Sequence, residues 1–242
     1  MLKKALQYLH YFSQSIINRG LRFTFRLLYY EYTTERKLGI DSLQIENLED
    51  KTLASGYNEA FHHYQGASYY ITDQLFNALP APLQQYRLLD MGCGKGRILV
   101  YALYKGMARA DGLDVAQELC QAAERNLERA AQHLGKSWRY EVFFADAGGF
   151  TIDPATNLLF LFNPFNEAVM RKVSQQVLQS LAGAPREFWV VYVNPVYPMV
   201  WLQAGFDMYY ELSSRSYIEG IIFKYSSKAK VVSSPELSAV SC

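Results

Sequence analysis

The spacing of apolar residues predicts alternating strands and helices from residue 86 onward. Short apolar runs are expected to form strands over 86–92, 108–115, 139–147, 157–165 and 187–195, and amphipathic segments to form helices over 96–106, 117–135 and 167–183. Two further strands, 206–212 and 221–227, have no helix between them and should pair as an antiparallel hairpin. Runs such as LLFLF and WVVYV are apolar throughout, which favours a parallel sheet covered on both faces. The pattern therefore predicts an α/β, doubly wound, mostly parallel seven-stranded sheet with a C-terminal antiparallel hairpin.

The N-terminal part has a different pattern. Apolar residues from Leu2 to Ile16 recur every three or four positions, which predicts an amphipathic helix that Gly20 interrupts. Residues 31–60 are polar and weakly periodic and are expected to form a loop with short helical turns. A further helix is expected over 69–80, ended by Pro80. We therefore divide the chain into a helical extension or cap over 1–63, a main domain over 64–226 and a loose tail over 227–242.

Composition limits the protein's partners and location. The chain has 24 basic and 23 acidic residues, and this balance gives no strong nucleic-acid signal. Its three cysteines form no C-x-x-C pair, and no apolar run approaches the length of a membrane span, so neither a metal site nor a transmembrane segment is expected. These features predict a soluble, cytoplasmic protein. Five basic residues and no acidic residue precede Glu31, so a weak membrane-surface contact through residues 1–30 stays open.

A glycine-rich loop is the main candidate for chemistry. The first predicted strand runs through Asp90 into Gly92, Gly94 and Gly96, and a helix follows. Open α/β sheets bind ligands at the carboxyl ends of their strands, and glycine lets the backbone approach a ligand closely. A dinucleotide fingerprint would need glycine at position 97, where this chain has arginine, and the phosphate P-loop pattern is absent.

The spacing D-x-G-x-G-x-G resembles motif I of class I S-adenosylmethionine-dependent methyltransferases. The resemblance implies that S-adenosylmethionine is the cofactor and that the loop wraps its methionine half. It further implies that strand-end carboxylates contact the ribose hydroxyls and the adenine amino group. The residues that it implies for cofactor binding are Asp90, Gly92, Cys93, Gly94, Gly96, Asp114, Val115, Asp146, Ala147 and Asn163, with Tyr64 and Ser68 as donors to the cofactor carboxylate.

The methyl acceptor is expected at the end of the fourth strand. Asn163-Pro164-Phe165 resembles the [DNS]-P-P-[YF] motif of N-methyltransferases, which implies that these residues orient a nitrogen acceptor. This chain has one proline fewer, so the aromatic residue comes one position early and oxygen stays open as the less favoured acceptor. Tyr197 and Trp201 fit either an acceptor pocket, together with Asn194, or packing on the sheet.

Several alternatives stay open. An oxidoreductase with a nicotinamide cofactor is disfavoured by Arg97 and by the terminal hairpin. A non-catalytic module of the methyltransferase fold fits the same motifs. The N-terminal extension fits a cap over the cofactor cleft or a helix on a membrane surface, and the cap is favoured because Arg22 and Arg26 alternate with apolar residues. The acceptor itself, a small molecule or a protein side chain, has no specific motif.

Overall fold

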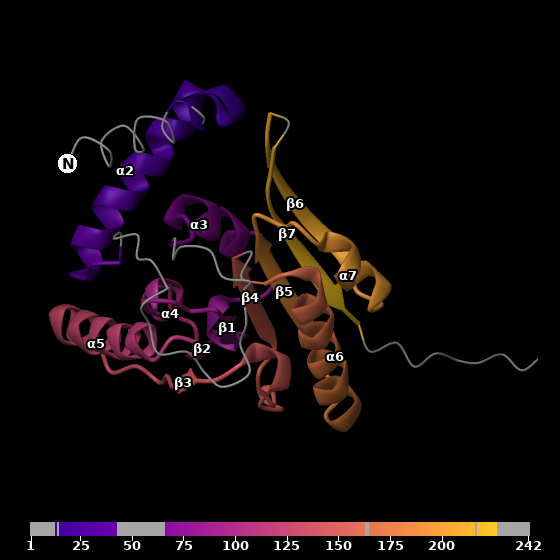
Figure 1. Ribbon diagram of the computed structural model, residues 1–242. Coiled ribbons are helices and arrows are strands. Elements are labelled where there is room, and N and C mark those ends of the chain that lie inside the picture. Colours follow the sequence, from indigo (N-terminus) through magenta and orange to yellow (C-terminus); the bar gives the residue numbers. More distant parts are fainter. Residues whose placement is uncertain (1–12, 14, 43–65, 163–164, 216, 227–242) are drawn as a thin grey trace, which may run out of the picture.

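The computed structural model describes residues 13, 15–42, 66–162, 165–215 and 217–226 (Figure 1). Its centre is a seven-stranded sheet in the order β3-β2-β1-β4-β5-β7-β6. The first five strands in this order are parallel, and β7 runs antiparallel to both β5 and β6. The strands are β1 (Arg87–Met91), β2 (Arg109–Asp114), β3 (Val142–Phe144), β4 (Leu158–Phe162), β5 (Phe188–Val193), β6 (Asp207–Ser214) and β7 (Tyr217–Tyr225). The predicted sheet and its antiparallel C-terminal pair are confirmed.

Helices cover both faces of the sheet (Figure 1). On one face lie α3 (Tyr69–Asn77), α4 (Arg97–Tyr104) and α5 (Gln117–Leu134), and on the other lie α6 (Glu167–Gly183) and α7 (Pro198–Gln203). Successive strand residues point to opposite faces, so Leu88 packs with the first group of helices and Leu89 with the second. Burial on both sides explains why β5 is apolar along its whole length.

Helices α5 and α6 have ends close to the predicted ones, and local capping residues fix these ends. Gly135 ends α5 in the left-handed conformation, with φ 60°, and the Asn166 side chain accepts the Val169 N–H at the start of α6. The short 3₁₀ helices η1 (Leu83–Gln85) and η2 (Ala147–Gly149) and the helix α7 were not predicted. The third strand is shorter than expected because only Val142–Phe144 pairs with β2.

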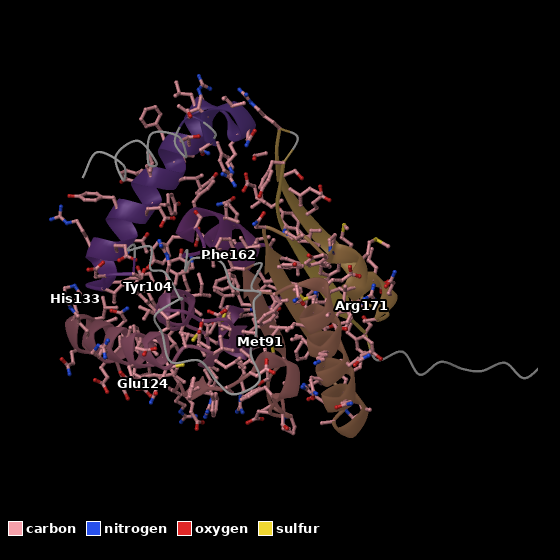
Figure 2. The ribbon with its side chains drawn as sticks, in the orientation of Figure 1. Met91, Tyr104, Glu124, His133, Phe162 and Arg171 are labelled. Carbon is pink, nitrogen blue, oxygen red and sulfur yellow. The ribbon has the colours of Figure 1, made fainter. Side chains whose placement is uncertain are left out.

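Helix α2 (Leu21–Leu38) corrects the expectation of a loop from residue 31. Gly20 precedes it with φ 88° and Gly39 ends it with φ 69°, so glycine marks both ends. The helix packs on α3, α4 and α5 as an outer layer (Figure 1). Its last turn reaches the far end of α5, where Figure 2 labels His133, against whose ring a Cβ on Gly39 would press. The C-terminal half of α2 lacks a regular apolar repeat. It is stabilised by contacts of Glu31 and Glu35 with Arg97 and Tyr69.

Candidate cofactor-binding site

The glycine loop joins β1 to α4 at the carboxyl edge of the sheet. Gly92, Gly94 and Gly96 have φ values of 86°, 53° and 72°, a region that side chains with a Cβ rarely adopt. The Gly92 N–H donates to the Leu113 carbonyl at 2.9 Å, which ties the loop to β2. A Cβ on Gly96 would lie 2.8 Å from the Ala123 Cβ, so this glycine also lets α5 approach. The backbone therefore requires all three glycines.

Asp114 ends β2 and holds the loop in place. Its Oδ2 accepts the Gly94 N–H and its Oδ1 accepts the Ala116 N–H, both at 2.9 Å. Burial raises the pKa of this carboxyl group, and the two backbone N–H groups oppose that rise. A carboxylate oxygen accepts more than one hydrogen bond, so Asp114 keeps capacity for ligand hydroxyl groups. The structure thus brings together the loop and the predicted ribose-binding residue.

Asp90 and Cys93 lie buried at the same place. Burial, and next the charge of Asp114, raise the pKa of Asp90 well above its usual range. Burial and the two carboxylates likewise raise the pKa of the Cys93 thiol, so it stays protonated and is no nucleophile. Val115, also buried, follows Asp114 at the start of the next turn. These residues shape and polarise the loop and provide no reactive group.

Asp146 lies at the next strand end. Its Oδ1 accepts the Gly148 N–H at 3.0 Å and thereby starts η2, with Ala147 buried beneath. The Ala145 N–H donates to the Asp114 carbonyl at 3.1 Å, so the ends of β2 and β3 are adjacent. The three predicted acidic strand ends therefore lie along one edge of the sheet.

Arg97 links the loop to α2. In the sequence analysis this residue served only to disfavour a dinucleotide-binding fingerprint. Its guanidinium forms an ion pair with Glu31, lies 4.0 Å from the Glu35 carboxylate, and stacks 3.9 Å from the centre of the Tyr69 ring. Burial lowers its pKa to about 9, so it stays protonated at neutral pH. Glu31 also accepts the Tyr69 N–H at 2.9 Å. This network fixes α2 to the first residues of α3 and α4.

The buried hydroxyl of Ser68 indicates whether the site can hold the predicted cofactor. Ser68 precedes α3, and its buried hydroxyl has no hydrogen-bond partner among the described residues. The same holds for the Thr72 hydroxyl, one turn further on, and for the Arg97 Nε. Buried donors without partners are costly, so they indicate a ligand acceptor such as a carboxylate. The predicted donor Tyr64 lies outside the described residues. The left-handed glycines and the Ser68 hydroxyl together fit the predicted cofactor.

Of the three residues predicted to orient the methyl acceptor, the structure describes only Phe165. Asn163 and Pro164 directly follow β4 and lie outside the described residues; Figure 2 labels Phe162, the last residue of that strand. Phe165 packs in the core beside α6 and is 6% exposed. Its role as an aromatic surface for the acceptor stays a prediction.

Residues after β5 fall into two groups. Trp201 is a core residue against Phe206, which favours packing over an acceptor pocket, and Tyr197 packs at the border of the same core. Asn194 has a left-handed φ of 49°, and its Oδ1 accepts the Tyr217 hydroxyl. Of the described residues in this set, Asn194 and the partly buried Tyr197 stay candidates for the acceptor side.

Comparisons of sequence give short matches. No protein-family model matches the chain. An uncharacterized protein of Haemophilus influenzae is 33% identical over 60 residues, which is 25% of this chain and 24% of that protein. The ribosomal protein L11 methyltransferase of Yersinia pestis is 41% identical over 58 residues, 24% of this chain and 18% of that enzyme. The matches thus span about a quarter or less of these relatives.

Solved structures similar to the chain include methyltransferases. A S-adenosylmethionine-dependent methyltransferase of Aquifex aeolicus has a TM-score of 0.47 and 15% identity, covering 64% of this chain and 88% of that one. Magnesium protoporphyrin IX methyltransferase of Synechocystis, with bound S-adenosylmethionine, has a TM-score of 0.42 and 15% identity, covering 64% and 74%. The seven-stranded sheet with its antiparallel last pair and the glycine loop after β1 confirm, at the level of the fold, the predicted resemblance to class I S-adenosylmethionine-dependent methyltransferases.

Proposed function

We propose that this chain transfers a methyl group from S-adenosylmethionine to a nitrogen acceptor, with oxygen the less favoured alternative. One observation supports this function most. Three left-handed glycines, the middle one of which donates its N–H to Asp114, form the loop at the carboxyl edge of the sheet. An oxidoreductase is disfavoured further because Arg97, in place of the fingerprint's last glycine, is buried in an ion pair with Glu31.

The described residues would hold the cofactor as follows. The loop from Asp90 to Gly96 would surround the methionine half, and the Ser68 hydroxyl would donate to its carboxylate. Asp114 would accept the ribose hydroxyls and Asp146 the adenine amino group. When bound, S-adenosylmethionine supplies an electrophilic methyl group. The remaining task of the protein is to position an acceptor lone pair, which by itself contributes much of the rate of such displacements.

Asn163 would do this positioning. It directly follows β4 in the chain, and β4 runs parallel to the neighbouring β1, so the end of β4 lies at the same edge of the sheet as the loop. Its amide oxygen would accept an N–H from the acceptor and so orient the lone pair. The N-terminal extension over 1–63 would close the acceptor side. Two contacts support that role: Glu31 pairs with Arg97 beside the loop, and Arg19 pairs with Glu219 on β7.

Titration calorimetry tests cofactor binding. We expect saturable heat with S-adenosylmethionine and comparable affinity for S-adenosylhomocysteine, because the loop and Asp114 contact parts common to both. Gly94→Val should abolish this heat, since a β-branched residue is strained at its φ of 53°. Saturable binding of NAD without heat from either form would overturn the proposal.

Two further variants separate the roles. Asp114→Ala should weaken cofactor binding, whereas Asn163→Ala should lower the single-turnover rate of methyl transfer to fractionated cell extract and leave cofactor affinity nearly intact. Equal losses of cofactor affinity with unchanged single-turnover rates would contradict these assignments. Tight cofactor binding with no transfer to any fraction would favour the non-catalytic module.

A further inference from the structure

The outer face of α2 carries large apolar side chains in contact with solvent. Leu21, Leu28, Tyr29 and Tyr32 are 49% to 67% exposed. Residues separated by seven, eight and eleven positions lie on one side of a helix, so these four form one stripe, called here the outer stripe. Figure 1 shows α2 as the outermost helix on its side of the sheet. The stripe therefore lies on the surface of the described molecule.

The inner face of the same helix carries its acidic residues. Glu31 and Glu35 face the buried guanidinium of Arg97, and Glu35 also accepts the Tyr69 hydroxyl at 2.8 Å. A surface helix of a water-soluble domain usually has the reverse distribution, with charged residues outward. In α2 the Glu35 carboxylate is buried and that of Glu31 is partly buried, while large apolar residues are exposed, although exposing them to water has no benefit for folding.

Arginines surround the N-terminal end of the outer stripe. Arg19, Arg22, Arg26 and Arg215 line a hollow of about 1070 Å³, and none of its described lining residues is acidic. Arg19 is partly neutralised by Glu219, and Arg215 donates to the Ile17 carbonyl, while Arg22 and Arg26 are exposed. The sequence has no acidic residue between Met1 and Glu31. Positive charge is thus concentrated beside the exposed apolar stripe.

We propose that this face docks on an anionic lipid bilayer, with α2 lying in the plane of the membrane surface. The outer stripe would enter the boundary between head groups and acyl chains, and the arginines would contact lipid phosphates. Apolar residues flanked by arginines are the composition that binds such a surface. Among the described residues, none of the helices combines the length and apolar character needed to cross a membrane. The binding is therefore interfacial, and the inference does not rest on methyl transfer.

Co-sedimentation of the full-length protein with vesicles tests this proposal. We expect binding to phosphatidylcholine vesicles that contain phosphatidylglycerol, and much weaker binding to phosphatidylcholine alone. High salt should reduce the binding because screening shortens the range of charge interactions from about 10 Å at 0.1 M to about 3 Å at 1 M. Arg22→Gln should weaken it about fivefold. The double variant Leu21→Ser/Leu28→Ser should weaken it about tenfold or more.

Matched variants elsewhere on the surface serve as controls. Met199→Ser removes an apolar side chain of similar exposure, 56%, and Arg129→Gln removes an exposed arginine on α5. Both should bind vesicles as the wild type does, and all variants should keep its thermal midpoint. Equal losses in the controls, or no binding by the wild type, would overturn the proposal. So would a dimer in solution that Leu21→Ser/Leu28→Ser dissociates, or RNA binding sensitive to Arg22→Gln without vesicle binding.

Discussion

The two halves of the sheet's carboxyl edge are built by different means. At β1 and β2, backbone conformation and one carboxylate from Asp114 shape the glycine loop within about a single strand-helix-strand unit. At β5 and β7, the arrangement depends on side chains far apart in the chain: Arg19 pairs with Glu219, 200 residues away, and the Tyr217 hydroxyl donates to Asn194. The first half is therefore determined locally, and the second needs the N-terminal segment in place.

Helix α2 connects the two halves. Glu31 in its middle pairs with Arg97 after the glycine loop, while Arg19, just before its start, pairs with Glu219 on β7. Changes at the loop should therefore affect cofactor binding directly, and changes at the Arg19 end should affect the acceptor side alone.

Gly96→Val should have the largest effect. Valine at a φ of 72° is strained, and its Cβ would lie 2.8 Å from the Ala123 Cβ. We expect the free energy of unfolding to fall by about 4 kcal/mol, with loss of cofactor binding, as measured by chemical denaturation and calorimetry. Gly135→Ala is the control, because its φ is 60° and nothing lies within 4 Å of the added Cβ. It should lose only about 1 kcal/mol, and an equal loss would disprove the packing argument.

Arg97→Leu should have the next largest effect. It leaves the buried Glu35 carboxylate and the partly buried Glu31 carboxylate without their cation. We expect a loss of about 3 kcal/mol in the free energy of unfolding, since removing one partner of a buried pair leaves an uncompensated charge. Adding Glu31→Gln to Arg97→Leu should recover part of that loss in a double-mutant cycle. Strictly additive effects would show that α2 is not fixed to the loop through this pair.

The sequence predicted the locally determined half well. The alternation of apolar strands and amphipathic helices predicted the parallel sheet, and the spacing of the three glycines predicted the loop, because both depend on neighbouring residues. The sequence missed α2 beyond residue 31, because Glu31 is satisfied by Arg97, 66 residues away. Arg97 begins the otherwise apolar stretch RILVYALY, and a charged residue in such a stretch indicates a buried partner of opposite charge. Pairs such as Arg19 and Glu219 leave no such local signal.

Arg19→Gln tests the distant half. Its loss leaves the buried Glu219 carboxylate with the Ser214 hydroxyl as its remaining described side-chain partner. We expect a loss of about 2 kcal/mol in unfolding free energy and an unchanged cofactor affinity. Arg22→Gln, on the exposed face, is the control and should change stability by less than about 0.5 kcal/mol. A clear fall in cofactor affinity for Arg19→Gln would contradict the division of the edge.

Asp90→Asn tests how the ionisation of Asp90, beside the glycine loop, affects the pH dependence of stability. Burial and the charge of Asp114 raise the folded-state pKa of Asp90, so the folded state binds more protons than the unfolded chain. Its stabilising contribution is therefore complete at acid pH and is lost as the pH rises through the folded-state pKa. Without cofactor, the variant should be more stable than the wild type at neutral pH by about 1 kcal/mol or more. The difference should shrink toward about pH 4; a difference independent of pH would refute this assignment.

Tyr217→Phe should have the smallest effect and the most selective one. It removes the hydroxyl that donates to the Asn194 Oδ1 and keeps the ring over which the Arg19 guanidinium lies, 4.8 Å from its centre. Asn194 holds a left-handed φ of 49°, and its N–H donates to the Glu219 carbonyl at 2.9 Å, so the lost hydrogen bond should loosen this turn at the end of β5.

We expect a loss of about 1 kcal/mol in stability, together with a higher KM for the methyl acceptor and an unchanged cofactor Kd. Tyr209→Phe removes a hydroxyl from an exposed tyrosine on the neighbouring strand β6 and should change neither constant. A Tyr217→Phe variant whose cofactor Kd rises as much as its acceptor KM would show that the two halves are coupled at this residue. In that case a single side-chain hydroxyl on β7 would control the loop between β1 and α4, and the two halves of the edge would not be independent.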